Sequence, residues 1–120
     1  MSNRIGYITP QIEHILGLTS KQDRYIYIGP SNIQHKTTSH PNDYRKYGNR
    51  IIEILNAPDY IGLNPKDDSI EYVKEFKIEN ENIKVAVRVS NSGKYYARSL
   101  YVLNNNRVRN FIASGTLKKL

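Results

Sequence analysis

The sequence predicts an α+β domain in which helices come first, an antiparallel β-meander follows and one small helix comes last. Two patterns support this fold class. Before residue 58, short apolar stripes repeat with the period of a helix, and each lies between residues that cap or break helices. After residue 58, apolar and polar residues alternate as they do in strands. The helices are therefore expected to pack on one face of the sheet. With 120 residues, no internal repeat and no linker, residues 1–120 are expected to form a single domain.

Three helices are expected in the first half of the chain. The first begins at Pro10, with Thr9 as its N-cap, and ends at Gly17. Ser31 is a suitable N-cap for the second, which Pro41 ends because the residue before a proline disfavours the α conformation. A third helix follows Pro41, and its buried face consists of Ile51, Ile52, Ile54 and Leu55.

Strands dominate the second half. The expected strands are the brief segments 25–28 and 60–63 and the longer segments 69–78, 83–90 and 95–103. The first long segment places Ile70, Tyr72, Phe76 and Ile78 on one face. Residues 91–93 make a tight hairpin turn. A short helix that ends at Gly115 follows, and residues 116–120 form either a basic tail or a last edge strand.

The composition favours a polyanionic partner. Eighteen Lys and Arg stand against 11 Asp and Glu, which gives a formal net charge of +7. A positive field on a small domain attracts nucleic acid, although a charge that only maintains solubility is the alternative. Ten tyrosines accompany two Phe and no Trp. Tyrosines interleaved with basic residues suit stacking on bases.

Several absences narrow the function classes. Without Cys, the chain forms no disulfide, no catalytic thiolate and no Cys-ligated metal site. No apolar run approaches the roughly 20 residues that cross a bilayer, and the first residues contain no apolar stretch of signal-peptide length. We therefore expect a soluble protein with no membrane partner. The three histidines lack HExxH spacing, so no metal site and no cofactor are expected.

The segment 31–40, SNIQHKTTSH, contains His35 and His40 and is the candidate reaction centre. Histidine takes and gives a proton near neutral pH. Cleavage of RNA by its own 2′-hydroxyl needs a base for that proton and an acid for the leaving 5′-oxygen. It also needs cations or hydrogen-bond donors at the phosphate. The two histidines are candidates for the base and the acid, and the candidates for the phosphate are Lys74, Arg88 and Arg98.

The spacing of the two histidines raises a geometric objection. Residues five apart on a straight helix point about 140° apart. The pair therefore requires the helix to break at His40, which the following Pro41 favours. A purely structural role for either histidine is the competing interpretation.

The strand YYARSLYVL provides the second candidate group. Regular alternation places Arg98 on the face that also carries Tyr96, Leu100 and Val102, and places Ser99 and Tyr101 on the opposite face. An arginine among apolar residues either pairs with a carboxylate such as Glu71 or lines a phosphate pocket. The two faces cannot both form the site, so Arg98 is favoured over Tyr101.

The order of these motifs resembles a known group of nucleases. The pattern H-x4-HP at residues 35–41, then PDYIGLNPKDDSIEYVKEF at 58–76 and SGKYYARSLYVLN at 92–104, is similar to the phage-type group (PBECR) of the barnase–EndoU–colicin–RelE nucleases. The similarity covers about residues 5–120. Its most specific parts are the two histidines with the proline, residues 58–62 and residues 98–101.

The resemblance implies a BECR-like fold in which two N-terminal helices precede a four-stranded antiparallel sheet. It implies a metal-independent endoribonuclease that leaves a 2′,3′-cyclic phosphate and a 5′-hydroxyl. By position, the motif histidines are His35 and His40, with either one as the base, and the arginine–serine pair is Arg98 and Ser99. The sheet lysine is Lys74. Arg88 and Tyr101 are then candidates for substrate binding.

Partners and setting follow from the same resemblance. The expected substrate is RNA, with tRNA among the candidates, and an acidic immunity or antitoxin protein would suit the basic surface. The site of action would be the cytoplasm, reached in some family members by delivery as a toxin domain. Two other functions stay open: a non-catalytic nucleic-acid-binding module, and a protein-interaction domain with a basic face.

Overall fold

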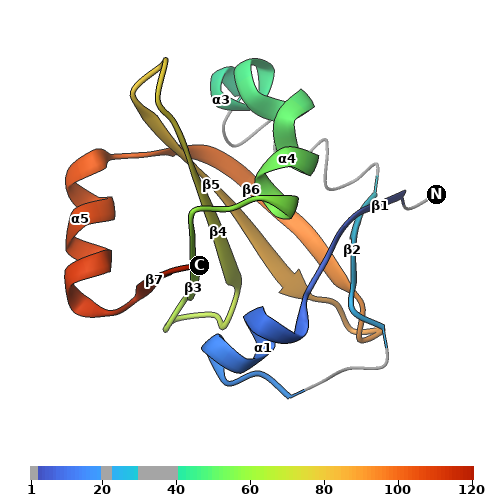
Figure 1. Ribbon diagram of the computed structural model, residues 1–120. Coiled ribbons are helices and arrows are strands. Elements are labelled where there is room, and N and C mark those ends of the chain that lie inside the picture. Colours follow the sequence, from blue (N-terminus) through green and yellow to red (C-terminus); the bar gives the residue numbers. More distant parts are fainter. Residues whose placement is uncertain (1–2, 20–22, 30–40) are drawn as a thin grey trace.

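A mixed seven-stranded β-sheet forms the centre of the computed structural model, which describes residues 3–19, 23–29 and 41–120 (Figure 1). The strands are β1 (Asn3–Tyr7), β2 (Tyr25–Ile28), β3 (Tyr60–Leu63), β4 (Ile70–Phe76), β5 (Glu81–Val89), β6 (Tyr95–Leu103) and β7 (Leu117–Lys119). The helices are α1 (Pro10–Leu16), α3 (Pro41–Tyr47), the 3₁₀ turn η1 (Gly48–Arg50), α4 (Ile51–Asn56) and α5 (Asn105–Ser114). Within these residues, no helix combines the length and the apolar character that crossing a bilayer requires.

The strands follow one another across the sheet in the order β1-β2-β6-β5-β4-β3-β7. Every neighbouring pair is antiparallel except β2 and β6, which run parallel. The antiparallel pair of β1 and β2 lies at one edge, and β3 with β7 lies at the other (Figure 1). The central strands β4, β5 and β6 correspond to the three long strands predicted from alternation.

The expectation of N-terminal helices packed on a four-stranded antiparallel sheet is wrong, although the α+β class holds. The additional strands lie at the two edges of the sheet. Of these, β1 has the sequence NRIGY, which shows no clear alternation, and β7 has only three residues, too few for alternation to mark a strand. Helices also contribute to two separate apolar clusters: α1 and α4 to the larger one, α5 to a smaller one. The strand β7 agrees with the edge-strand interpretation of residues 116–120.

Helix α1 begins and ends where the sequence predicts. The Thr9 Oγ1 accepts a hydrogen bond from the Ile12 N–H at 3.2 Å, and Pro10 is the first helical residue. Gly17 ends the helix with φ of 68°, a left-handed conformation that glycine adopts without strain. The buried Glu13 then pairs with Arg24 at 3.0 Å, which fixes α1 against the segment that enters β2.

Two residues predicted for buried faces are exposed instead. Ile52 is 53% exposed because α4 is a short helix that turns Ile51, Ile54 and Leu55 toward the sheet. Ile78 is 98% exposed because β4 ends at Phe76 and the chain turns before β5 begins. Ile52 thus lies on the outer face of its helix, and Ile78 lies in the turn after its strand.

Candidate functional site

A β-bulge in β6 determines which side chains share a face of the sheet. Arg88 pairs with Tyr96 and Val87 with Ala97, but Ala86 pairs with Ser99. The residue between them, Arg98, is therefore the extra residue of a bulge. Partners in an antiparallel pair lie on the same face, so Tyr96 and Ser99 share one face even though they are three residues apart.

The bulge corrects the expectation that Arg98 and Ser99 point to opposite faces. Below the bulge, Tyr101 pairs with Lys84 and lies on the same face as Ser99. The Arg98 guanidinium lies 5.7 Å from the centre of the Tyr96 ring, on that face too. Leu100 instead belongs to the buried core on the other side. We call the face that carries Lys84, Arg88, Tyr96, Arg98, Ser99 and Tyr101 the open face.

A buried ion pair lies at the centre of the open face. The Lys84 Nζ donates to Glu71 Oε2 at 2.7 Å, and only 9% and 5% of the two side chains are exposed. Glu71 also accepts a bond from the Asn64 amide at 3.3 Å, and the Lys84 Nζ lies 4.9 Å from the centre of the Tyr101 ring. Burial alone would lower the pKa of Lys84, but hydrogen bonds to Glu71 and Tyr101 leave that pKa above its ordinary value. Lys84 is thus a fixed cation at neutral pH.

Arg88 stands at the more exposed rim of this face. Its guanidinium lies 3.5 Å from Asp67, and the two side chains are 50% and 37% exposed. Hydrogen bonds from the backbone and the hydroxyl of Ser69 lower the pKa of the Asp67 carboxyl, which keeps it ionised. An exposed pair of this kind is weak and can exchange its carboxylate for another anion.

Tyrosine rings extend the open face toward β2. Tyr27 of β2 pairs with Tyr96 of β6, and the two rings lie 5.9 Å apart. The Lys94 Nζ lies 5.1 Å from the Tyr27 ring centre. Tyr27 is buried, whereas Tyr96 and Tyr101 are partly exposed beside cations, as rings are on surfaces that bind single-stranded nucleic acid.

Lys74 does not join this group. It follows Val73 in β4, and Val73 belongs to the same cluster as Leu103 on the open-face side. Alternation directs Lys74 to the opposite side of the sheet. Its Nζ donates to the Ala57 carbonyl at 2.8 Å, just past the end of α4. This contact fits a lysine that satisfies an end-of-helix carbonyl.

His35 and His40 lie outside the described residues. The described residues on both sides of this segment contact β6. Before the segment, β2 pairs with β6 at Tyr95 and Tyr96; after it, α3 begins at Pro41. In α3, the Asp43 carboxylate accepts a hydrogen bond from the Val102 N–H at 3.0 Å. Both described flanks of the histidine segment are therefore attached to the strand that carries Arg98 and Ser99.

Sequence reasoning missed Lys84 and the tyrosines at positions 27 and 96. The hairpin turn at 91–93 was a usable signal, since it pairs Arg88 with Tyr96. Without the bulge, the same register would place Lys84 opposite Leu100. The sequence therefore does not indicate that Lys84 pairs with Tyr101. Among the described residues, no group of three or more His, Asp or Glu side chains is arranged to hold a metal ion.

A comparison with protein families agrees with the resemblance seen in the motifs. The family PBECR3, described as phage-Barnase-EndoU-ColicinE5/D-RelE like nuclease3, matches residues 3–110. The match spans the sheet from β1 through β6 and most of α5. No curated protein and no solved structure matches the chain.

Proposed function

We propose that this chain, which belongs to the PBECR3 family of phage-Barnase-EndoU-ColicinE5/D-RelE like nucleases, is an endoribonuclease that cleaves RNA through the 2′-hydroxyl without a metal ion. The β6 bulge is the observation that supports this proposal most directly. It gathers two arginines, a hydroxyl and a tyrosine around the fixed cation Lys84 on a single face. Cations and donors held in place are what a phosphate needs as negative charge develops on it.

RNA is favoured over duplex DNA by the nature of this face. Tyr96 and Tyr101 are partly exposed and present rings beside cations, and rings of this kind stack on unpaired bases. The net charge of +7 adds attraction for the phosphate backbone. A single strand lying across this face would meet the rings of Tyr96 and Tyr101 and the guanidinium of Arg98 on β6, and the guanidinium of Arg88 on β5.

In the proposed reaction, a base removes the proton of the 2′-hydroxyl and the 2′-oxygen attacks the adjacent phosphorus. The bond from phosphorus to the 5′-oxygen then breaks, and an acid protonates the leaving oxygen. The products are a 2′,3′-cyclic phosphate and a 5′-hydroxyl. We assign the base to His40 and the acid to His35, with the reverse assignment as the alternative.

The phosphate is assigned to the open face. Arg98 and Arg88 neutralise the charge of the pentacoordinate phosphorus, and Ser99 donates to one of its oxygens. Lys84 takes the place proposed from sequence for Lys74, because Lys74 is on the other side of the sheet. The contact of Lys84 with Tyr101 holds that tyrosine toward the substrate.

The test is cleavage of RNA by the purified protein in the presence of EDTA, with analysis of the fragment ends. The wild type should leave 2′,3′-cyclic phosphates and should not cut a strand that lacks the 2′-hydroxyl at the scissile position. Arg98→Ala and the double variant His35→Ala/His40→Ala should lose activity, whereas Lys77→Ala, an exposed charge in the β4–β5 turn, is the control. Full activity of the double histidine variant would remove the acid–base assignment.

We also propose an acidic inhibitor protein as a partner, because a nuclease active on cellular RNA harms the cell that makes it. The net charge of +7 would attract an inhibitor with an acidic surface and speed the association of the two proteins. Expression provides the test: cells should tolerate the double histidine variant but not the wild type. Equal tolerance of both proteins would remove the need for an inhibitor.

A further inference from the structure

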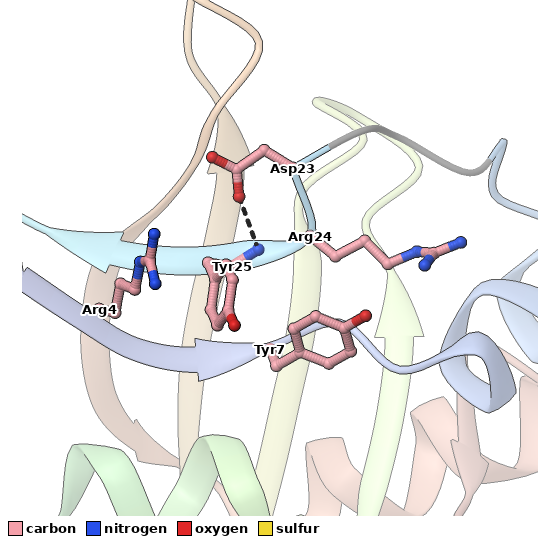
Figure 2. A pocket seen from close by; sticks show the side chains of 5 residues that line it. All are labelled: Arg4, Tyr7, Asp23, Arg24 and Tyr25. Atoms are coloured by element: carbon pink, nitrogen blue, oxygen red, sulfur yellow. Dashed lines mark hydrogen bonds between the residues drawn. The ribbon is translucent and has the colours of Figure 1, made fainter.

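We infer that a pocket on the paired strands β1 and β2 binds one nucleotide of the substrate strand beside the cleavage site. The pocket has a volume of about 290 Å³ and is lined by Arg4, Tyr7, Asp23, Arg24 and Tyr25 (Figure 2). The inference rests on the proposed function, since it extends the path of the RNA beyond the open face. It concerns residues that neither the sequence motifs nor the proposed reaction uses.

Two exposed rings and a guanidinium form the core of this pocket. Tyr25 lies between Arg4 and Tyr7 (Figure 2): the Arg4 guanidinium is 4.2 Å from its ring centre, and the Tyr7 ring meets it edge-on at 5.3 Å. Tyr7 and Tyr25 are 38% and 39% exposed, so ring surface remains available to solvent. Aromatic and guanidinium planes at this exposure can stack on an unpaired base.

The two arginines of the pocket differ in whether a carboxylate already pairs with them. Arg24 is held by Glu13 at 3.0 Å, so its charge is already balanced. Arg4 forms no ion pair with any of the described residues, and it is exposed. Its donors can therefore bind a phosphate oxygen while its plane stays on Tyr25.

Asp23 gives the pocket an acceptor. Its carboxylate accepts bonds from the Tyr27 hydroxyl at 2.7 Å and from the Tyr25 N–H at 3.0 Å, and these bonds lower its pKa. Each carboxylate oxygen keeps a further lone pair, which an amino group of a base can use. Arg4 can donate to a phosphate and Asp23 can accept from a base. This combination fits a nucleotide better than a bare anion, which offers no hydrogen-bond donor.

The pocket lies on the same side of the sheet as the open face. Arg4 of β1 pairs with Tyr27 of β2, so both lie on the same side of the sheet, and Tyr27 contacts Tyr96. Neighbouring strands lie about 4.8 Å apart, which puts β1 about 10 Å from β6. A single strand that reaches Arg98 can thus extend past Tyr96 and over the buried Tyr27 into the pocket on β1 and β2.

Substrates of two lengths test the inference. Arg4→Ala and Tyr7→Ala should lower kcat/KM on a single-stranded oligonucleotide about tenfold more than on a dinucleotide that fills only the cleavage site. Lys77→Ala removes one charge from the distant β4–β5 turn and should change both substrates to the same small extent. Equal losses on the two substrates for Arg4→Ala would overturn the subsite.

A binding measurement separates this inference from the proposed activity. The probe is a fluorescent oligonucleotide without 2′-hydroxyls, followed by anisotropy. Weaker binding by Arg4→Ala than by Lys77→Ala supports the subsite even if the protein cleaves no RNA, and equal binding by the two variants overturns it even if cleavage is found. A nucleoside monophosphate should also displace the probe at lower concentration than inorganic phosphate. Equal displacement would mean a simple anion site and would refute the nucleotide assignment.

Discussion

The Lys84 ammonium lies 2.7 Å from the Glu71 carboxylate, at the centre of an otherwise accessible face of the sheet. The two residues are diagonal neighbours on β5 and β4, since Lys84 pairs with Val73 and Glu71 with Ala86. Removing two charges from water is costly, and their attraction offsets this cost only while both are present. The pair therefore fixes the cation in place without adding much stability over an apolar pair.

Breaking this pair from one side should destabilise the fold more than removing it altogether. Lys84→Met leaves Glu71 buried without its cation and should lower the free energy of unfolding by about 3 to 5 kcal/mol. Lys84→Met/Glu71→Met should recover most of that loss while still impairing RNA cleavage. Urea unfolding measures the first effect. Equal stability of the single and double variants would contradict the coupling.

The same pair predicts how stability changes in alkaline solution. The pKa of Lys84 is raised in the folded state: burial opposes the charge, but the bonds to Glu71 and Tyr101 outweigh it. A raised pKa contributes stability that is complete below the unfolded value of about 10.4 and is lost as the pH rises through the higher folded value. The urea midpoint of the wild type should therefore fall toward that of Lys84→Met above about pH 10.5, because a neutral Lys84 also leaves Glu71 without a cation. A constant difference between the two proteins up to pH 12 would contradict this assignment.

Arg98 and Lys74 should behave differently because they lie on opposite sides of the sheet. Arg98→Ala should lower kcat/KM for RNA by about 100-fold, the usual cost of one transition-state donor, with little change in stability. Lys74→Ala should leave cleavage within about twofold and lower the free energy of unfolding by about 1 kcal/mol, since it removes the bond to the Ala57 carbonyl. The opposite pattern would return Lys74 to the catalytic group.

Tyr72 contains a buried polar group that no described residue satisfies. Its ring is fully buried in the larger apolar cluster, and its hydroxyl has no hydrogen-bond partner among the described residues. Burial raises its pKa far above the ordinary value. Tyr72→Phe should therefore be neutral or should stabilise the fold by up to about 1 kcal/mol in thermal unfolding. A clear loss of stability would reveal a partner for the hydroxyl.

Gly62 of β3 is required where Thr116 leads the chain into the neighbouring strand β7. A Cβ at this position would lie 2.3 Å from the Thr116 carbonyl oxygen, a backbone atom that cannot move aside easily. Gly62→Ala should therefore lower the free energy of unfolding by about 1 to 3 kcal/mol. Gly6→Ala is the comparison, because its Cβ would meet only side-chain atoms at 3.1 Å or more. Equal losses would show that β7 adapts to the added methyl group.

Local patterns predicted the elements whose determinants are local. Thr9, Pro10 and Gly17 defined α1, and alternation found the strand 95–103 with the bounds of β6. The outer strands depend on partners far away in the sequence, and residues such as Asn3–Tyr7 show no alternation that would mark a strand. Their pairing is a property of the assembled sheet.

For the candidate site, too, the sequence indicated the residues but not their arrangement in the folded sheet. Arg98, Ser99, Arg88 and Tyr101 were selected from residue type and motif, and the structure places all four on the open face. Alternation alone assigned two of them to the wrong side, because a single inserted residue reverses the facing of everything beyond it. His35 and His40 lie outside the described residues, so their roles stay predictions.

The position of β2 beside β6 and of β7 beside β3 has a kinetic consequence. The strands β4, β5 and β6 are joined by short turns, whereas the two outer pairings close long loops between distant parts of the chain. Loop closure costs more entropy as the loop lengthens, and non-local contacts slow folding. The central strands are therefore expected to assemble first during refolding. The proposed pocket on β1 and β2 would then form only with the late attachment of these outer strands.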